Sequence, residues 1–498
     1  MDEKIEPLLR YTFARDHGFA VTSLSNESAT VAMRSDANAL MLAEVRRVVG
    51  KLLTVEQMDK QAFDTLLSDL HAVEGIDSGI DDEMPSESLD SALEGMPAVA
   101  DLLASEDDAP VIRLINSLIA EAVKNKASDI HLEPFENRLS VRLRVDGVLN
   151  EIASLAARLA PYIVSRIKVM ARLDIAEKRI PQDGRLSLKL GERVFDVRVS
   201  TLPSRHGERV VLRLLDASQA HLTLTDLGMQ EQVLETMKEL LSEPNGIILV
   251  TGPTGSGKTT TLYGGLALLN DQSRNIMTVE DPVEYALDGV SQTQVNPKVG
   301  MTFASGLRAI LRQDPDVVMV GEIRDMETAE MAIQASLTGH LVLSTVHTNS
   351  AVAAITRLRD MGVEPFLLAS TVKGILAQRL VRKLCSDCKT PVKDTTLLRE
   401  QLGVSAETEV SFFEPQGCQS CGGKGYSGRI GIYELVKVDA DIRRLIQEQA
   451  SEQEMEAVAF QNTNTLSASG RELVLAGITT VEEVMRVSKV KEGTSAGV

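Results

Sequence analysis

The chain has 498 residues and a mass of 54.0 kDa, enough for roughly two to four domains with cores of their own. With 43% hydrophobic and 25% charged residues, its composition is that of a globular protein and excludes a fibrous or wholly disordered chain. The net charge of −19 argues against a general nucleic-acid binder, because such proteins carry a basic footprint.

The N-terminal part is expected to hold a small domain followed by a linker. Residues 1–74 mix apolar helical stretches with turns, and residues 40–53 have the spacing of an amphipathic helix. Between Lys60 and Arg113 there is no Lys or Arg but there are fourteen acidic residues. Because self-repelling charge with little apolar surface cannot offset the entropy of ordering, residues 75–109 are predicted to be a flexible acidic linker.

From residue 110 onward the pattern is α/β. Residues 111–123 have helical spacing, and residues 139–145 alternate apolar and charged side chains before the hairpin signal Asp146-Gly147. Further strands are predicted at 194–200 and 209–215. After about residue 232, strands alternate with helices, which is the signature of a parallel sheet.

A glycine-rich loop follows the buried strand predicted at 246–252 and opens a helix. It fits the P-loop pattern in the required strand–loop–helix context. Loop N–H groups and the helix N-terminus would bind phosphates, while Lys258 would reach the β- and γ-phosphates and the Thr259 hydroxyl would bind Mg²⁺. The predicted nucleotide-binding residues of this loop are Gly252, Pro253, Thr254, Gly255, Ser256, Gly257, Lys258, Thr259 and Thr260.

Two later strands end in carboxylates, which favours turnover over simple binding. The strand at 276–280 leads into Glu280, Asp281 and Glu284, and the strand at 317–320 leads into Glu322. Ligands of open α/β sheets bind at the carboxyl ends of strands. Glu322 is therefore expected to reach Mg²⁺ through a water molecule. Glu284 is the candidate that orients or deprotonates the attacking water, with Glu280 as the alternative.

A third apolar strand is bracketed by His340 and His347. A histidine beside the γ-phosphate can sense it by a hydrogen bond, although a lone histidine is more often structural. We include His347 among the predicted nucleotide-site residues.

Four segments in order, 252–259, 276–284, 316–322 and 339–348, resemble the Walker A, aspartate, Walker B and histidine boxes of the secretion-ATPase superfamily of types II and IV. Within it, the chain is similar to the general secretory pathway protein E family, the assembly ATPases of type II secretion. Further stretches that match this family lie at 128–133, 144–147, 181–185 and 203–210.

The resemblance implies a domain order and further site residues. A partner-binding domain (1–74) and the linker (75–109) would precede a PAS-like N-terminal half of the motor (110–232) and a RecA-like ATPase domain (233–498). The N-terminal half would supply Arg198 and Arg213 to the phosphates. Arg308, Arg312 and Arg324 match arginines of the C-terminal half, at subunit contacts or at the edge of the site.

The resemblance also implies a function. The chain would be a Mg²⁺-dependent ATPase and a homohexamer whose ATP hydrolysis drives pseudopilus assembly and the export of folded proteins across the outer membrane. Its partners would be the cytoplasmic domain of the inner-membrane protein L and the platform protein F, with no nucleic acid.

The location and the rival functions follow from the same features. No apolar run approaches the roughly 18–20 residues that span a bilayer, and no signal-peptide pattern opens the chain. We expect a cytosolic protein, attached peripherally to the bacterial inner membrane through a partner. The alternatives are a type IV pilus-extension ATPase, a DNA-handling motor and a non-enzymatic nucleotide-gated scaffold.

All four cysteines fall in two C-x-x-C pairs that are separated by 29 residues. This spacing in a cytosolic chain predicts a tetrahedral Zn²⁺ site, structural because no ligand position stays open. The subdomain would cover about 384–430, with Cys385, Cys388, Cys418 and Cys421 as ligands. The segments 378–383 and 424–429 make it locally basic, which suits a partner surface or plain solvation.

Overall fold

The structure of this chain is a computed structural model, and it divides into two compact units, Met1–Ala217 and Ser218–Val498. It describes residues 13–14, 17–25, 28–60, 62–63, 66, 109–190, 193–216, 222–405, 408, 410–461 and 463–488. The acidic linker predicted at 75–109 lies outside the described residues, apart from Ala109, which begins a helix.

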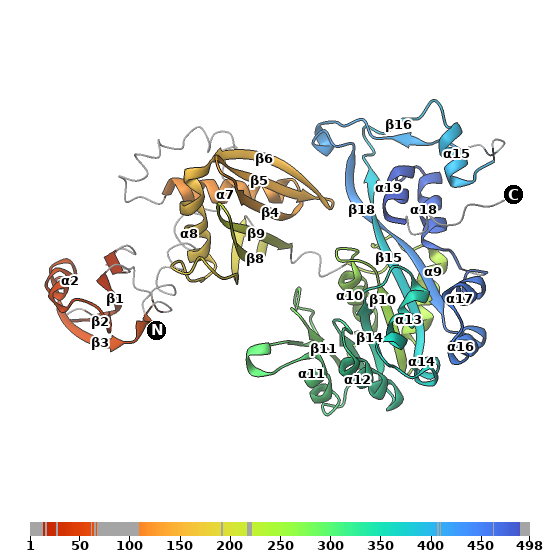
Figure 1. Cartoon of the computed structure of the whole chain (residues 1–498), viewed down its shortest axis with the longest axis horizontal. Helices are drawn as coiled ribbons and strands as arrows, with labels where there is room; N and C mark the ends of the chain where they lie inside the picture. The colour runs from red at the N-terminus through yellow and green to blue at the C-terminus, as the bar shows by residue number, and fades with distance from the viewer. Residues whose placement is uncertain are drawn as a thin grey trace. The chain divides into compact units, whose positions relative to one another are not determined.

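The first unit begins with a three-stranded sheet of order β1-β2-β3, in which β1 and β2 are antiparallel and β2 and β3 are parallel (Figure 1). Its elements are β1 (Phe19–Leu24), β2 (Ser28–Arg34), η1 (Ala39–Met41), α2 (Leu42–Val49) and β3 (Leu52–Met58). Helix α2 packs Val45 against Phe19. The helix predicted over 40–53 ends earlier, because Gly50 adopts a left-handed conformation (φ 68°) and β3 follows.

The rest of the first unit is a six-stranded antiparallel sheet of order β6-β5-β4-β9-β8-β7. Its elements are α7 (Ala109–Lys124), β4 (Ala127–Pro134), β5 (Arg138–Val145), β6 (Val148–Ala156), η2 (Ala157–Leu159), α8 (Ala160–Met170), β7 (Gln182–Leu190), β8 (Arg193–Ser204) and β9 (Gly207–Asp216). The predicted alternation in β5 is confirmed, since Val141, Leu143 and Val145 are buried. The predicted hairpin is confirmed too: Asp146 (φ 50°) and Gly147 (φ 85°) join β5 directly to β6.

The second unit is built on a seven-stranded sheet of order β12-β11-β13-β14-β10-β15-β18, parallel except for the last strand (Figure 1). Its strands are β10 (Gly246–Thr251), β11 (Ile276–Glu280), β12 (Ser291–Gln294), β13 (Val317–Val320), β14 (Leu341–Val346), β15 (Val372–Leu384) and β18 (Tyr426–Lys437), with a separate pair β16 (Thr390–Pro391) and β17 (Phe413–Glu414). The parallel sheet predicted from the alternation of strands and helices is confirmed.

Helices cover both faces of this sheet because its central strands are apolar on both sides. In β10, Ile247 and Leu249 belong to one buried cluster, and Ile248 and Val250 to another. Helices α9 and α10 pack in the second cluster, and α11–α14 and α16–α19 in the first. The helices are α9 (Glu231–Leu241), α10 (Lys258–Leu269), η4 (Pro297–Val299), α11 (Phe303–Ile310), α12 (Met326–Leu337), α13 (Ala351–Asp360), α14 (Pro365–Thr371), α15 (Thr396–Leu402), η5 (Gln419–Cys421), α16 (Ala440–Gln447), α17 (Glu452–Ala459), α18 (Leu466–Leu475) and α19 (Val481–Ser488).

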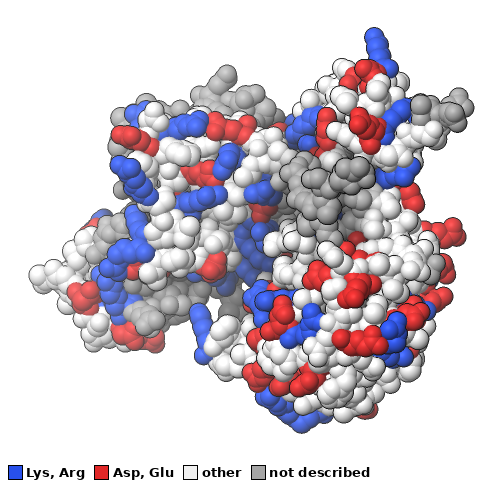
Figure 2. All heavy atoms as spheres, turned by 45° about the vertical axis from the view of Figure 1, so that its right-hand side comes forward, with Lys and Arg blue, Asp and Glu red and all other residues white. Residues whose placement is uncertain are grey.

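The surface carries charges of both signs. Figure 2 shows acidic and basic side chains interspersed over the visible face, with uncharged surface between them. Among the residues that the structure describes, no helix combines the length and the apolar character that crossing a bilayer requires.

Candidate nucleotide site and metal centre

The glycine-rich loop joins the carboxyl end of β10 to α10 near the middle of the parallel sheet. Two of its glycines are required by close packing against β15. A Cβ atom on Gly252 (φ 149°) would lie 2.5 Å from the Gln378 carbonyl oxygen, and one on Gly257 (φ 87°) would lie 2.9 Å from Gln378 Nε2. Pro253, Thr254 and Gly255 form the exposed top of the loop. The backbone of the loop can therefore approach a ligand closely.

Lys258 is buried at the first position of α10, with 9% of its surface exposed. Its Nζ donates hydrogen bonds to the carbonyl oxygens of Gly252 (2.8 Å) and Pro253 (3.1 Å). Burial lowers the pKa of Lys258 to about 8, although the Glu322 carboxylate opposes this shift. The lysine is thus a partly desolvated cation that lies over the loop and has only backbone acceptors.

The carboxyl ends of the adjacent strands β13 and β14 bring Glu322 and His347 to this lysine. His347 Nε2 lies 3.0 Å from Glu322 Oε1, and His347 Nδ1 lies 3.5 Å from Lys258 Nζ. Arg324 Nη2 lies 2.8 Å from the other oxygen of Glu322. The structure thus joins the predicted Lys258, Glu322 and His347 in one chain of contacts. His340 lies at the opposite end of β14, where its Nδ1 is 2.9 Å from the Ala335 carbonyl oxygen.

The two candidate bases differ in their surroundings. Glu280, at the end of β11, is 2% exposed, and burial raises its pKa. Its carboxylate accepts hydrogen bonds from Thr278 Oγ1 (2.5 Å), Gln292 Nε2 (3.1 Å) and the Tyr263 hydroxyl. Glu284 follows four residues later and is half-buried, and its backbone N–H donates to the Tyr263 hydroxyl (3.3 Å).

The loop fits a phosphate group and a hard cation. Within the described residues, the buried Ser256 Oγ has no hydrogen-bond partner, so it can bond a phosphate oxygen. Thr259 and Thr260 occupy the first turn of α10 and are half-buried. The Thr259 hydroxyl and the Glu322 carboxylate are oxygen ligands, which Mg²⁺ prefers.

The predicted arginines Arg198 and Arg213 belong to the first unit. They lie directly opposite each other on β8 and β9. Arg213 Nε donates to Asp129 Oδ1 at 3.0 Å. Because like charges placed opposite each other on a sheet destabilise it, this pair favours binding of an anion. Arg308 and Arg312 lie on the exposed side of α11 and just beyond it, where Arg308 pairs with Glu327 at 3.2 Å.

Three polar residues that support the loop were not among the predicted site residues. Thr251 Oγ1 lies 2.7 Å from Thr348 Oγ1 and accepts from the Thr348 N–H, which ties β10 to the segment that carries His347. Gln378 and Arg379 are buried in β15, and Arg379 Nη2 donates to both oxygens of Asn349. These two residues therefore do not belong to the basic surface expected at 378–383. A charged residue inside an apolar strand is the signal that could have identified them.

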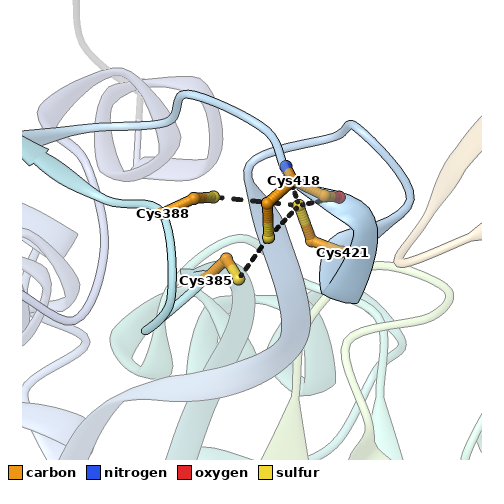
Figure 3. A group of neighbouring side chains, drawn as sticks. All are labelled: Cys385, Cys388, Cys418 and Cys421. Atoms are coloured by element: carbon orange, nitrogen blue, oxygen red, sulfur yellow. Dashed lines mark hydrogen bonds between the residues drawn. The ribbon is translucent and has the colours of Figure 1, made fainter.

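The four cysteines converge although they come from two distant segments (Figure 3). Cys385 and Cys388 follow β15, and Cys418 and Cys421 precede β18. All four sulfur atoms lie within 4.8 Å of one another, with separations of 3.8 Å for 385–418, 388–421 and 418–421. Sulfurs at about 2.3 Å from a tetrahedral zinc ion are about 3.8 Å apart, so the arrangement fits Zn²⁺.

The protein environment also favours a thiolate in this cluster. Burial raises the pKa of Cys421, but the backbone N–H groups of Cys418 (3.2 Å) and Gly425 (3.1 Å) donate to its sulfur, and its pKa falls to about 6. Such N–H···S bonds around knuckle cysteines stabilise the deprotonated ligand that a metal requires.

Comparison with protein families gives two matches. A family described as "Type II/IV secretion system protein" matches residues 104–486. A second family, which describes an N-terminal domain of GSPII protein E, matches residues 8–71.

Individual relatives and solved structures agree with these matches. The chain is 54% identical to type II secretion system protein E of Pseudomonas aeruginosa (97% of this chain, 96% of the relative) and 53% identical to type II secretion system ATPase E of Vibrio cholerae (96% and 93%). Its fold resembles the ATPase DotB of Legionella pneumophila (TM-score 0.57, 20% identity, 75% of this chain and 94% of that one). It also resembles the pilus retraction motor PilT with bound ADP (TM-score 0.52, 29% identity, 75% and 96%).

Proposed function

The chain belongs to the type II/IV secretion system protein family, in its protein E branch of type II secretion ATPases, and from this premise we propose how its residues use ATP. It is an ATP-hydrolysing enzyme that works with a secretion machinery. The finer proposal is a Mg²⁺-dependent motor that drives pseudopilus assembly and export of folded proteins across the outer membrane.

The contact chain Lys258–His347–Glu322 carries this proposal. It places a cation, an imidazole and a carboxylate beside a loop whose buried Ser256 hydroxyl lacks a partner among the described residues. Lys258 would exchange its two carbonyl acceptors for β- and γ-phosphate oxygens. His347 would then lie between the γ-phosphate and Glu322 and report which nucleotide is bound.

Mg²⁺ would be held by the Thr259 hydroxyl and, through water, by Glu322. Its chemistry is to neutralise charge that develops on the β- and γ-phosphates. Glu284 would orient and deprotonate the attacking water. We choose Glu284 over Glu280 because Glu280 is buried and both of its oxygens are already occupied by protein donors.

The remaining roles extend the motor beyond one nucleotide site. Arg198 and Arg213 would supply positive charge to the phosphates from the N-terminal half of the motor (110–232), against the ATPase domain (233–498). A homohexamer, with Arg308, Arg312 and Arg324 at subunit contacts or the edge of the site, would place six such sites in a ring.

We further propose that residues 1–74 bind the cytoplasmic domain of inner-membrane protein L, and that the linker at 75–109 lets the motor move while this domain stays anchored. Platform protein F would be the second partner. The chain would thereby be held peripherally at the inner membrane, with no nucleic acid involved. The four cysteines would hold a structural Zn²⁺ ion in a subdomain at about 384–430.

Lys258→Ala tests the chemical core of the proposal. The change removes the charged side chain that is buried over the loop, so ATP turnover by the full-length assembled chain should fall by roughly 10²–10³-fold or more. Phosphate release with and without Mg²⁺ is the measurement, and the thermal melting curve is the control for folding. A variant that folds and retains parental turnover would contradict the proposed site.

A further inference from the structure

The hydroxyl group of Tyr263 connects the phosphate-binding helix to the segment that carries Glu284. Tyr263 lies in α10, five residues after Lys258, and is 2% exposed. Its ring packs edge-on against Tyr285, with 4.7 Å between ring centroids. The hydroxyl donates to Glu280 and accepts from the Glu284 N–H (3.3 Å) and from Gln292 Nε2 (3.3 Å). A hydroxyl has one hydrogen and two lone pairs, so its full capacity is used.

Glu280 fixes the direction of these bonds. A carboxylate accepts but does not donate, so the Tyr263 hydrogen must point toward Glu280. Both lone pairs of the phenol oxygen then remain for the Glu284 N–H and for Gln292. Thr278 Oγ1 and Gln292 Nε2 donate to the other oxygen of Glu280, which holds the carboxylate in place. Without an acceptor at this position, the hydroxyl could rotate and the bond from the Glu284 backbone would be lost.

We infer that Tyr263 and Glu280 are positioning residues for ATP hydrolysis, which hold the Glu284 backbone at a fixed place relative to the helix that carries Lys258. This inference rests on the proposed role of Glu284. Lys258 and Tyr263 belong to the same helix, so the group that grips the phosphates and the group that anchors the base move together. A displacement of about 1 Å in such an arrangement can cost roughly 10²-fold in rate.

Tyr263→Phe removes only the hydroxyl and keeps the ring against Tyr285. In the full-length assembled chain with ATP and Mg²⁺, kcat should fall by roughly 10- to 100-fold, while the affinity for ADP stays within about twofold. Tyr285→Phe is the matched control, because it makes the same change on the neighbouring ring and should leave kcat within about twofold.

Glu280→Gln is the second variant and does not depend on the first. The amide would turn an NH₂ group or a differently placed oxygen toward Tyr263, so the hydroxyl loses its fixed direction. Its kcat should fall as in Tyr263→Phe. Because both changes break one unit, the double variant should be no more than about twofold slower than the slower single variant.

The kinetic pattern decides between positioning and general packing. The inference is overturned if folded Tyr263→Phe keeps parental kcat, if kcat and ADP affinity fall in parallel with the melting temperature, or if the two single effects multiply. The proposed role of Glu284 fails separately, through parental turnover in Glu284→Gln. Loss of turnover in Glu284→Gln together with parental turnover in both positioning variants would overturn this inference alone.

Discussion

The phosphate loop and the cysteine cluster of the second unit are both built from short sequence motifs, but they satisfy their polar groups differently. In the loop, the Ser256 hydroxyl is buried without a partner in the described structure, and Lys258 contacts two carbonyl oxygens that a phosphate can replace. In the cluster, the four sulfurs face one another and two backbone N–H groups already bond Cys421.

The difference teaches how each region treats its ligand. A site that turns over substrate needs groups that can exchange partners at little cost, as Lys258 can. A structural metal site has no spare ligand position, so its ion stays for the life of the fold. Changes at the loop should therefore alter the ATPase rate, and changes at the cluster should alter stability.

The largest effect on turnover is expected from Glu284→Gln. The amide keeps the size of the side chain but cannot take a proton, so kcat should fall by roughly 10²–10⁴-fold while ADP affinity is preserved. Steady-state phosphate release and calorimetric ADP titration measure the two quantities. Asp288→Asn makes the same chemical change at an exposed loop position and should act like the parent. If Glu284→Gln hydrolysed ATP at the parental rate, the base would have to be another residue.

A smaller effect is expected from pH. In the nucleotide-free protein the Lys258 pKa is about 8, because burial disfavours the charged form. Bound phosphate favours that form and raises the pKa, so ATP affinity should be constant below about pH 8 and decline by up to about tenfold per pH unit above it. Titration of ATP binding with Lys258→Arg as control separates this group from others, since a guanidinium keeps its charge. An equal decline in both proteins would assign the titration elsewhere.

The smallest effect on ATP binding is expected from removing zinc. The purified chain should hold one zinc ion per four cysteines by atomic absorption. Phenanthroline, which binds zinc in preference to magnesium, should lower the melting temperature by roughly 4–8 °C, for a loss of about 2 kcal/mol. ATP affinity with Mg²⁺ present should change by less than about twofold. A melting curve that ignores the chelator would mean that the cluster does not depend on metal.

Much of the fold follows from local sequence patterns. The alternation in β5, the Asp146-Gly147 turn and the run of strands and helices after residue 232 each have a physical cause that acts over a few residues. The helix predicted over 40–53 was too long, because apolar spacing continues past Gly50 while the backbone turns there into β3.

The site was predictable where a motif defines it and not where tertiary contacts do. Lys258, Glu322 and His347 stand in recognisable boxes at strand ends, and the parallel sheet brings these ends together. The burial of Glu280 by Tyr263 depends on helix α10 packing against β11, which no local pattern reveals. The same holds for Arg379, whose strand gave no sign of which residues it would contact.

Strand β15 is continuous for thirteen residues, and it pairs with β10 beside the phosphate loop and with β18 along most of its length. Gln378 lies against Gly252 and Gly257, and Cys385 follows the last residue of the strand. These two points are roughly 20–25 Å apart along a stiff, doubly paired rod. Any tilt that nucleotide exchange imposes at Gln378 would thus swing the zinc knuckle like the far end of a lever.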